Sequence, residues 1–211
     1  METSAAGSDS ARVGPNAIVR VAEALDERLG ASAMAEVFRC AGLTGYLEAP
    51  PGSMVDEREA ARLFDTVYRS LPREDADAVM HRAGVLTAEY LLANRIPRPV
   101  QAVLKVLPAP LSGRALIAAI RGNAWTFAGS GTFRAAGGKR GEIEIAANPL
   151  RAPGCVWHVA VFETLLTALV HRKIRVVHGH PAPGGEICRF EFGVDAAARR
   201  GADRPLDAPL H

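Results

Sequence analysis

The chain has 211 residues, enough for one domain with short extensions, and its 48% hydrophobic and 23% charged residues are typical of a globular protein. The formal net charge of +2, from 25 basic and 23 acidic residues, gives no general attraction to nucleic acid or to an anionic membrane. Three scattered cysteines do not make a disulfide framework, which favours a reducing, cytoplasmic location. No apolar run reaches the roughly 18 residues of a membrane span, so any work at a membrane would be peripheral.

Both ends of the chain are small, polar and poor in large apolar side chains. We therefore expect a disordered tail over residues 1–14 and a flexible tail over residues 196–211. The first segment, METSAAGSDSARVG, has no apolar core, so it does not predict a signal peptide. A single domain is expected over residues 15–195.

Residues 15–124 read as a helical part, because apolar residues recur there at intervals of three and four. An Asp56/Glu59 pair resembles a capping box at the start of one helix, and Pro72 ends it. The expected helices lie within residues 14–30, 32–42, 55–72, 74–94, 99–107 and 112–122.

Residues 125–195 change to a mixed pattern that contains strands. In the segment 131–147, Ile143 and Ile145 alternate with Glu142 and Glu144 after a glycine-rich turn, which predicts a hairpin. A helix is expected within 155–173, and strands at 174–177 and 187–194 form a second hairpin. The sequence therefore predicts an α+β fold in which helices pack on a twisted antiparallel sheet of about four strands.

Short motifs for common cofactors and nucleophiles do not occur in this sequence. The segment AGSGTF, at 128–133, has two glycines but lacks the third of a dinucleotide-binding turn and leads into a strand. The segment GGKRG, at 137–141, lacks the spacing of a phosphate-binding loop. No catalytic residue is assigned by a motif, and neither a nucleotide-dependent nor a hydrolytic enzyme is indicated.

Four residues that can bind a metal fall close together near the second hairpin: Cys155, His178, His180 and Cys188. The hairpin can bring the last three together, and the start of a helix can deliver the first. Zinc favours four such ligands in a closed structural site. The alternative is that both cysteines are small buried hydrophobic residues and both histidines lie in a solvated loop. The spacing, which is not that of a zinc finger, leaves both interpretations open.

Several further residues are candidates for contact with a small molecule. His158 could bind the metal of a tetrapyrrole, cap a helix or lie at the surface, and Trp157 suits the core, where its indole N–H needs a partner. His81 is expected to be partly buried in a helix. Arg95 and Arg98 could bind carboxylates at a helix junction or be solvated.

Three segments carry a resemblance to a known family. The segment NPL…CVWHVAVFETLLTALV…IRVVHGHPAPGGEICRFEF is similar to the 4-vinyl-reductase domain family. With the segments GPNAI and RIPRPVQ, residues 12–195 resemble the J-protein family of bacteriochlorophyll biosynthesis in phototrophic bacteria. The resemblance implies the ligand-binding fold of haem nitric-oxide sensors and Golgi-transport subunits, in which helices on a sheet can enclose a cavity.

The resemblance also implies a metal arrangement. Related phenol-responsive sensor domains bind zinc through a cysteine before a long helix, a Glu-x-x-Cys pair and a second cysteine. Cys155 and Cys188 match the two outer cysteines. His180 stands near the middle cysteine and His178 near the glutamate, so two ligand identities differ from those of the sensors.

Three functions follow from the resemblance. The first is binding of a divinyl tetrapyrrole and its delivery to other bacteriochlorophyll biosynthesis enzymes; the second is catalytic 4-vinyl reduction of protochlorophyllide or chlorophyllide. The third is a zinc-containing sensor or assembly module. A location peripheral to the photosynthetic membrane and a homodimer are compatible with all three. The expected ligand contacts are His81, Arg95, Arg98, Trp125, Trp157 and His158.

Overall fold

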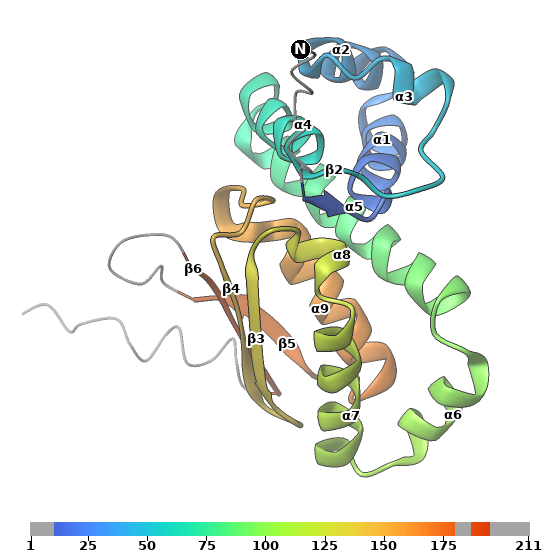
Figure 1. Ribbon diagram of the computed structural model, residues 1–211, viewed down its shortest axis with the longest axis vertical. Coiled ribbons are helices and arrows are strands. Elements are labelled where there is room, and N and C mark those ends of the chain that lie inside the picture. Colours follow the sequence, from blue (N-terminus) through green and yellow to red (C-terminus); the bar gives the residue numbers. More distant parts are fainter. Residues whose placement is uncertain (1–10, 180–186, 195–211) are drawn as a thin grey trace, which may run out of the picture.

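The computed structural model describes residues 11–179 and 187–194 and has the predicted α+β architecture (Figure 1). The helices and strands follow the chain in this order: β1 (Arg12–Val13), α1 (Asn16–Leu29), α2 (Ala31–Ala41), α3 (Gly45–Glu48), β2 (Val55–Asp56), α4 (Glu57–Ser70), α5 (Arg73–Asn94), α6 (Arg98–Val106), α7 (Ala109–Gly122), α8 (Trp125–Ala128), β3 (Thr132–Gly137), β4 (Gly141–Ala146), α9 (Val156–Leu169), β5 (Arg175–His178) and β6 (Ile187–Gly193). The turn of the second predicted hairpin, with Pro181, Pro183, Gly184 and Gly185, lies outside the described residues.

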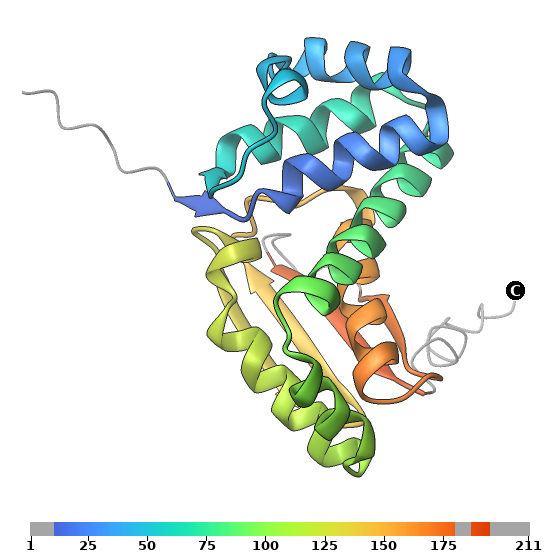
Figure 2. The ribbon, with the colours of Figure 1, turned by 90° about the vertical axis from the view of Figure 1, so that its right-hand side faces the viewer.

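The first four helices form a layer at one end of the molecule, and α5 runs from this layer toward the sheet (Figures 1 and 2). Apolar stripes make this layer cohere, with Phe38 and Phe64 completely enclosed. The start of α4 is capped as expected by Asp56, whose carboxylate accepts a hydrogen bond of 2.8 Å from the backbone N–H of Arg58. Glu59 also accepts a 2.5 Å hydrogen bond from the Tyr46 hydroxyl, which ties α3 to α4.

The start of the described chain is ordered, which corrects part of the expected tail over residues 1–14. Val13 pairs with Val55 in the small β1–β2 sheet and is completely buried. The backbone N–H of Gly14 donates to the carbonyl of Thr126, 2.6 Å away. One apolar side chain and one strand pair therefore anchor this segment, although the sequence around them is polar.

The main sheet has the strand order β3-β4-β6-β5, and every neighbouring pair is antiparallel. The predicted alternation in β4 is confirmed: Ile143 and Ile145 are buried, whereas Glu142 and Glu144 are half-buried. Arg189 of β6 lies opposite Glu144 and binds both glutamates, at 2.6 Å to Glu142 and 2.7 Å to Glu144. One face of the sheet is therefore apolar and the other carries charged pairs.

Helices α7 and α9 pack on the apolar face of the sheet (Figure 1). Two glycines allow close packing: one lies between α5 and α9, and the other lies between α7 and the turn that joins β3 to β4. A Cβ atom on Gly84 of α5 would lie 2.4 Å from the carbonyl oxygen of Trp157 in α9, and one on Gly113 of α7 would lie 2.0 Å from the carbonyl oxygen of Gly138. Arg121 of α7 also donates to the carbonyl of Ala135 in β3. Within residues 11–179 and 187–194, no helix combines the length and apolar character of a membrane span.

Candidate functional site

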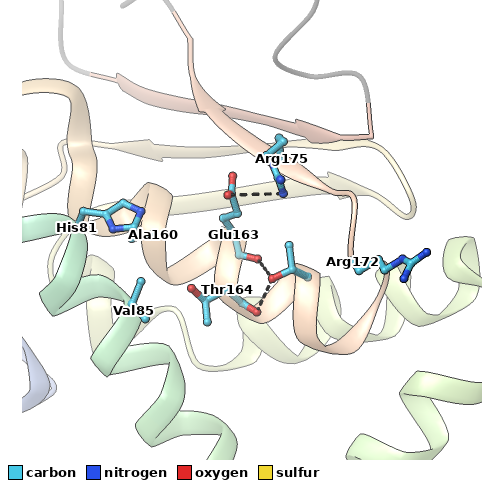
Figure 3. Close-up of a pocket in the computed structure, with 8 residues that line it drawn as sticks. His81, Val85, Ala160, Glu163, Thr164, Arg172 and Arg175 are labelled. Atoms are coloured by element: carbon cyan, nitrogen blue, oxygen red, sulfur yellow. Dashed lines mark hydrogen bonds and ion pairs between the residues drawn. The ribbon is translucent and has the colours of Figure 1, made fainter. Parts of the chain in front are cut away.

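Chemically active side chains gather in two places, and α9 contributes to both. The first, here called the thiol cluster, consists of Cys155, His178 and Cys188 at the start of α9 and the ends of β5 and β6. The second, here called the groove, is a pocket of about 400 Å³ between α5, α9 and the start of β5 (Figure 3).

The thiol cluster depends on an unusual turn before α9. Gly154 and Cys155 both have left-handed backbone conformations, with φ of 71° and 44°, and this turn directs the Cys155 side chain inward. The sulfur atoms of Cys155 and Cys188 lie 2.6 Å apart, longer than the ~2.05 Å of a disulfide bond, and both cysteines are free thiols. One ligand atom from each of Cys155, His178 and Cys188 lies within 4.8 Å of the others. Three of the four predicted metal ligands are therefore adjacent, and His180 lies outside the described residues.

The hydrogen bond between the two thiols shifts their pKa values in opposite directions. A hydrogen bond from Cys155, with smaller contributions from His178 and Asn148, lowers the pKa of Cys188 below its usual value. The Asn148 amide nitrogen is 3.5 Å from that sulfur. The pKa of Cys155 is raised by the same hydrogen bond and by burial. The hydrogen bond between the two thiols favours loss of a proton from Cys188, and the thiolate is the form that binds metals.

The residues present fit a zinc ion in donor chemistry. Two thiolates and an imidazole are preferred zinc ligands, and Zn–S bonds of about 2.3 Å place tetrahedral sulfurs about 3.8 Å apart. The sulfurs of Cys155 and Cys188 would have to separate by about 1 Å from their present 2.6 Å. A fourth ligand would have to come from a group other than Cys155, His178 and Cys188.

His158 is enclosed in the core, contrary to the expectation of a cap or a surface position. Its side chain is 1% exposed, and Phe127, Phe162 and Phe190 surround it. Neither ring nitrogen has a hydrogen-bond partner of normal geometry, although the carbonyl of Phe127 lies close enough to favour the protonated form weakly. Burial outweighs that effect and lowers the pKa of His158 to about 4, so the ring is neutral near pH 7.

Trp157 is also buried, as predicted, and packs edge-on against Phe64 with ring centres 5.6 Å apart. Its indole N–H has no hydrogen-bond partner among the described residues. Trp157 and His158 thus belong to the interior beside the thiol cluster, and neither lines the groove.

The groove combines cationic, acidic and apolar side chains. His81, which was expected to be partly buried, is exposed at its wall on α5 (Figure 3). Glu163 accepts a 2.7 Å hydrogen bond from the backbone N–H of Val176, and its carboxylate lies 4.0 Å from the Arg175 guanidinium. The lining residues are His81, Val85, Ala160, Glu163, Thr164, Thr167, Arg172 and Arg175.

This arrangement can bind a ligand that carries both a metal ion and an acidic group. The imidazole of His81 can bind a metal or donate a hydrogen bond, and the guanidinium groups of Arg172 and Arg175 can bind carboxylates. Arg175 keeps spare donors, since its side chain is half-exposed and its contacts among the described residues are the carbonyl of Ile174 and the carboxylate of Glu163.

The remaining predicted contacts lie elsewhere. Arg95 and Arg98, at the junction of α5 and α6, are exposed and do not line the groove. Trp125 begins α8 with 58% of its surface exposed and is also outside the groove.

The acidic and basic residues of the groove, Glu163, Arg172 and Arg175, were not predicted from the sequence. Glu163 interrupts the apolar stripe of α9, and the segment HRKIR follows that helix at 171–175. A carboxylate facing inward from an apolar helix, followed by a basic run, is the signal that could have indicated this site.

A comparison with solved structures supports the fold. An Fe(II) unliganded H-NOX protein from K. algicida is similar, with a TM-score of 0.52 at 10% identity over 86% of this chain and 96% of that chain. No family model matches the sequence.

Two curated relatives carry the same name, Bacteriochlorophyll synthase 23 kDa chain. The protein from Cereibacter sphaeroides is 38% identical over 86% of this chain and 90% of its own length. The protein from Rhodobacter capsulatus is 39% identical over 80% of each chain. The chain belongs to the family of the bacteriochlorophyll synthase 23 kDa chain, which confirms its resemblance to the J-protein family of bacteriochlorophyll biosynthesis.

Proposed function

We propose that this protein acts in bacteriochlorophyll biosynthesis by binding a divinyl tetrapyrrole intermediate of the protochlorophyllide or Mg-porphyrin type. It would hold the intermediate for processing or deliver it to other enzymes of the pathway. The observation that carries the proposal is the groove, where an exposed imidazole faces the same pocket as two guanidinium groups. The names of the two curated relatives support the pathway.

The chemistry of such an intermediate matches the groove. A magnesium ion in the centre of a tetrapyrrole accepts an axial ligand, which His81 can supply from α5. A propionate at the edge of the ring is a carboxylate, which Arg172 and Arg175 can bind. The pocket of about 400 Å³ is within the range of small-molecule sites, and Val85 and Ala160 provide apolar contact.

Titration with Mg-protoporphyrin and with metal-free protoporphyrin, followed by absorbance, tests the proposal. We expect His81→Ala to weaken binding of the magnesium form by about tenfold, roughly 1.4 kcal/mol, and to leave the metal-free form nearly unchanged. Trp125→Ala is the control, because Trp125 is exposed outside the groove. If neither porphyrin binds at micromolar concentration, the proposal is wrong.

Catalytic vinyl reduction is the competing activity, and the same purified protein tests it. Converting a vinyl to an ethyl group adds two electrons and two protons, so a donor such as NADPH or reduced ferredoxin must be supplied. Turnover of divinyl protochlorophyllide with one of these donors would assign reduction to this chain. Binding without turnover leaves the carrier function.

The thiol cluster supports a second candidate function, a zinc site of the kind that a sensor or assembly module uses structurally. The ion would join the start of α9 to β5 and β6 through Cys155, His178 and Cys188. The free, buried thiols of Cys155 and Cys188 beside the imidazole of His178 favour this role, because these are preferred zinc ligands.

A further inference from the structure

The end of the molecule formed by α6 and the start of α7 has a reversed polarity pattern, and we call it the α6 end. Helix α6 is held inward by Leu104, which is buried, and by Gln101, whose amide donates to the carbonyls of Leu92 and Ile96. A helix on the surface of a globular protein normally turns polar residues outward from such an anchor. Here the outward side is apolar.

The outward residues of α6 can be placed by the helical repeat of 100° per residue. Pro99, Ala102, Val103 and Val106 cover an arc of about 100° opposite Leu104. Val103 is 55% exposed and Val106 is 82% exposed. Leu111, at the start of α7, adds a further exposed apolar side chain beyond the turn. This is a small continuous apolar strip with no described element covering it.

The strip lies in the most one-sidedly charged part of the chain. Between Glu89 and Glu142 the sequence has no acidic residue, although it has eight basic ones: Arg95, Arg98, Lys105, Arg114, Arg121, Arg134, Lys139 and Arg140. Arg98 and Lys105 flank the strip on one side of α6, at about 90–110° from its centre, and both are exposed. The near-neutral balance of the whole chain therefore conceals a strongly basic region.

The end of α9 contributes more positive charge to the same end of the molecule (Figure 2). The Ser112 hydroxyl at the start of α7 donates to the carbonyl of Leu169, 2.8 Å away, so the α9–β5 turn lies beside the α6–α7 turn. Arg172 and Lys173 are exposed in that turn.

We propose that the α6 end is a docking surface for an anionic lipid bilayer. The valines enter the boundary between headgroups and acyl chains, while the longer arginine and lysine side chains reach the lipid phosphates. A second copy of this chain would bring the same positive charge and is disfavoured. A protein partner is a poorer match, because the strip has no aromatic side chain of the kind that anchors protein interfaces.

Flotation of the full-length protein with lipid vesicles tests the proposal. We expect binding to phosphatidylcholine vesicles that contain about one-third phosphatidylglycerol, and much weaker binding to pure phosphatidylcholine. Raising the salt concentration from about 0.1 M to about 0.5 M should weaken the binding, because the Debye length falls.

Variants on the exposed side separate the two contributions without disturbing the core. Lys105→Ala should lower partitioning by about fivefold, and the double change Val103→Ser with Val106→Ser should lower it by at least as much. Arg28→Ala removes the same charge from the last turn of α1, far from α6, and should have no effect (Figure 2). Melting temperatures of all variants should match that of the unchanged protein.

Three results would overturn the proposal: no binding to anionic vesicles, equal loss in Arg28→Ala and Lys105→Ala, or unchanged binding after the valine substitutions. Capture by soluble polyglutamate that equals capture by vesicles would also overturn it in favour of an acidic protein partner. The proposal does not rest on tetrapyrrole binding, and the Lys105→Ala protein should titrate with Mg-protoporphyrin as the unchanged protein does.

Discussion

The thiol cluster and the groove are both built on α9, but the two cysteines of the thiol cluster are buried, whereas the groove is open to solvent. At the start of the helix Cys155 and Cys188 are buried together, and His158 beside them is held neutral. Further along the same helix, Glu163 faces a pocket that also exposes His81. The difference teaches that residue type alone does not assign a role to a histidine: the enclosed one is part of the core, and the exposed one is available to a ligand.

The largest expected effect separates the two regions through the metal. If zinc occupies the thiol cluster, Cys188→Ser should reduce bound zinc at least tenfold and lower the free energy of unfolding by about 3 kcal/mol with zinc at a hundred times its Kd. Elemental analysis and urea denaturation measure these changes. Cys40→Ser is the matched control, because Cys40 is exposed on α2. Equal zinc content in both variants would show that the cluster holds no ion.

The second expected effect is a dependence of the free energy of unfolding on pH. Because the folded-state pKa of His158 is lowered to about 4, the unfolded chain binds more protons between pH 6.5 and pH 4. The stability contribution is therefore present above pH 6.5 and is lost as the pH falls toward 4, by about 3 kcal/mol at most. Cys188 and His178 are the titratable groups that act on His158, so the measurement requires metal-free protein.

Replacing His158 with phenylalanine provides the control for this pH dependence. Phenylalanine suits the aromatic surroundings formed by Phe127, Phe162 and Phe190 and cannot take up a proton. Urea denaturation of His158→Phe should therefore show a flatter dependence on pH than the unchanged protein. The same slope in both proteins would refute the role assigned to His158.

The third effect concerns the contact that holds α5 against α9. Gly84→Ala should lower the free energy of unfolding by about 2 kcal/mol, because the added methyl group meets backbone atoms of Trp157 that cannot move aside. Gly122→Ala, in the last position of α7, has open space for the methyl group and should be neutral or slightly stabilising. Thermal melts distinguish the two variants, and similar values would mean that α9 shifts easily.

The smallest effect lies in the groove. Arg175→Gln removes the guanidinium but keeps a polar side chain, and it should weaken binding of a free-acid porphyrin by about threefold to tenfold. The dimethyl ester of the same porphyrin should bind the variant and the unchanged protein equally, since the ester lacks the carboxylate charge. Absorbance titration makes the comparison. Equal weakening for acid and ester would assign Arg175 a structural role instead.

Much of the fold follows from sequence periodicity. The apolar stripe around Leu63 and Phe64 predicts α4, and the alternation at Ile143 and Ile145 predicts β4, because each pattern extends over several residues. The two-residue strands β1 and β2 are too short to show a period, so the burial of Val13 depends on contacts that only the folded chain reveals.

The candidate sites follow from sequence less completely. Cys155, His178 and Cys188 were grouped in advance, because the strand and helix ends on which they lie could be identified. The predicted burial of His81 and His158 was wrong, because both are in helices and their burial depends on which element packs opposite. Glu163 and Arg175 come together only through the α9–β5 connection.

Arg121 and Glu163 also limit strand pairing at the two edges of the main sheet. Strands β3 and β5 are its edges, and an uncovered edge strand can pair with a strand of another molecule and start aggregation. Arg121 occupies the Ala135 carbonyl on β3, and Glu163 occupies the Val176 N–H on β5. Each edge thus has a backbone group closed by a helix side chain, which opposes chain association by strand addition.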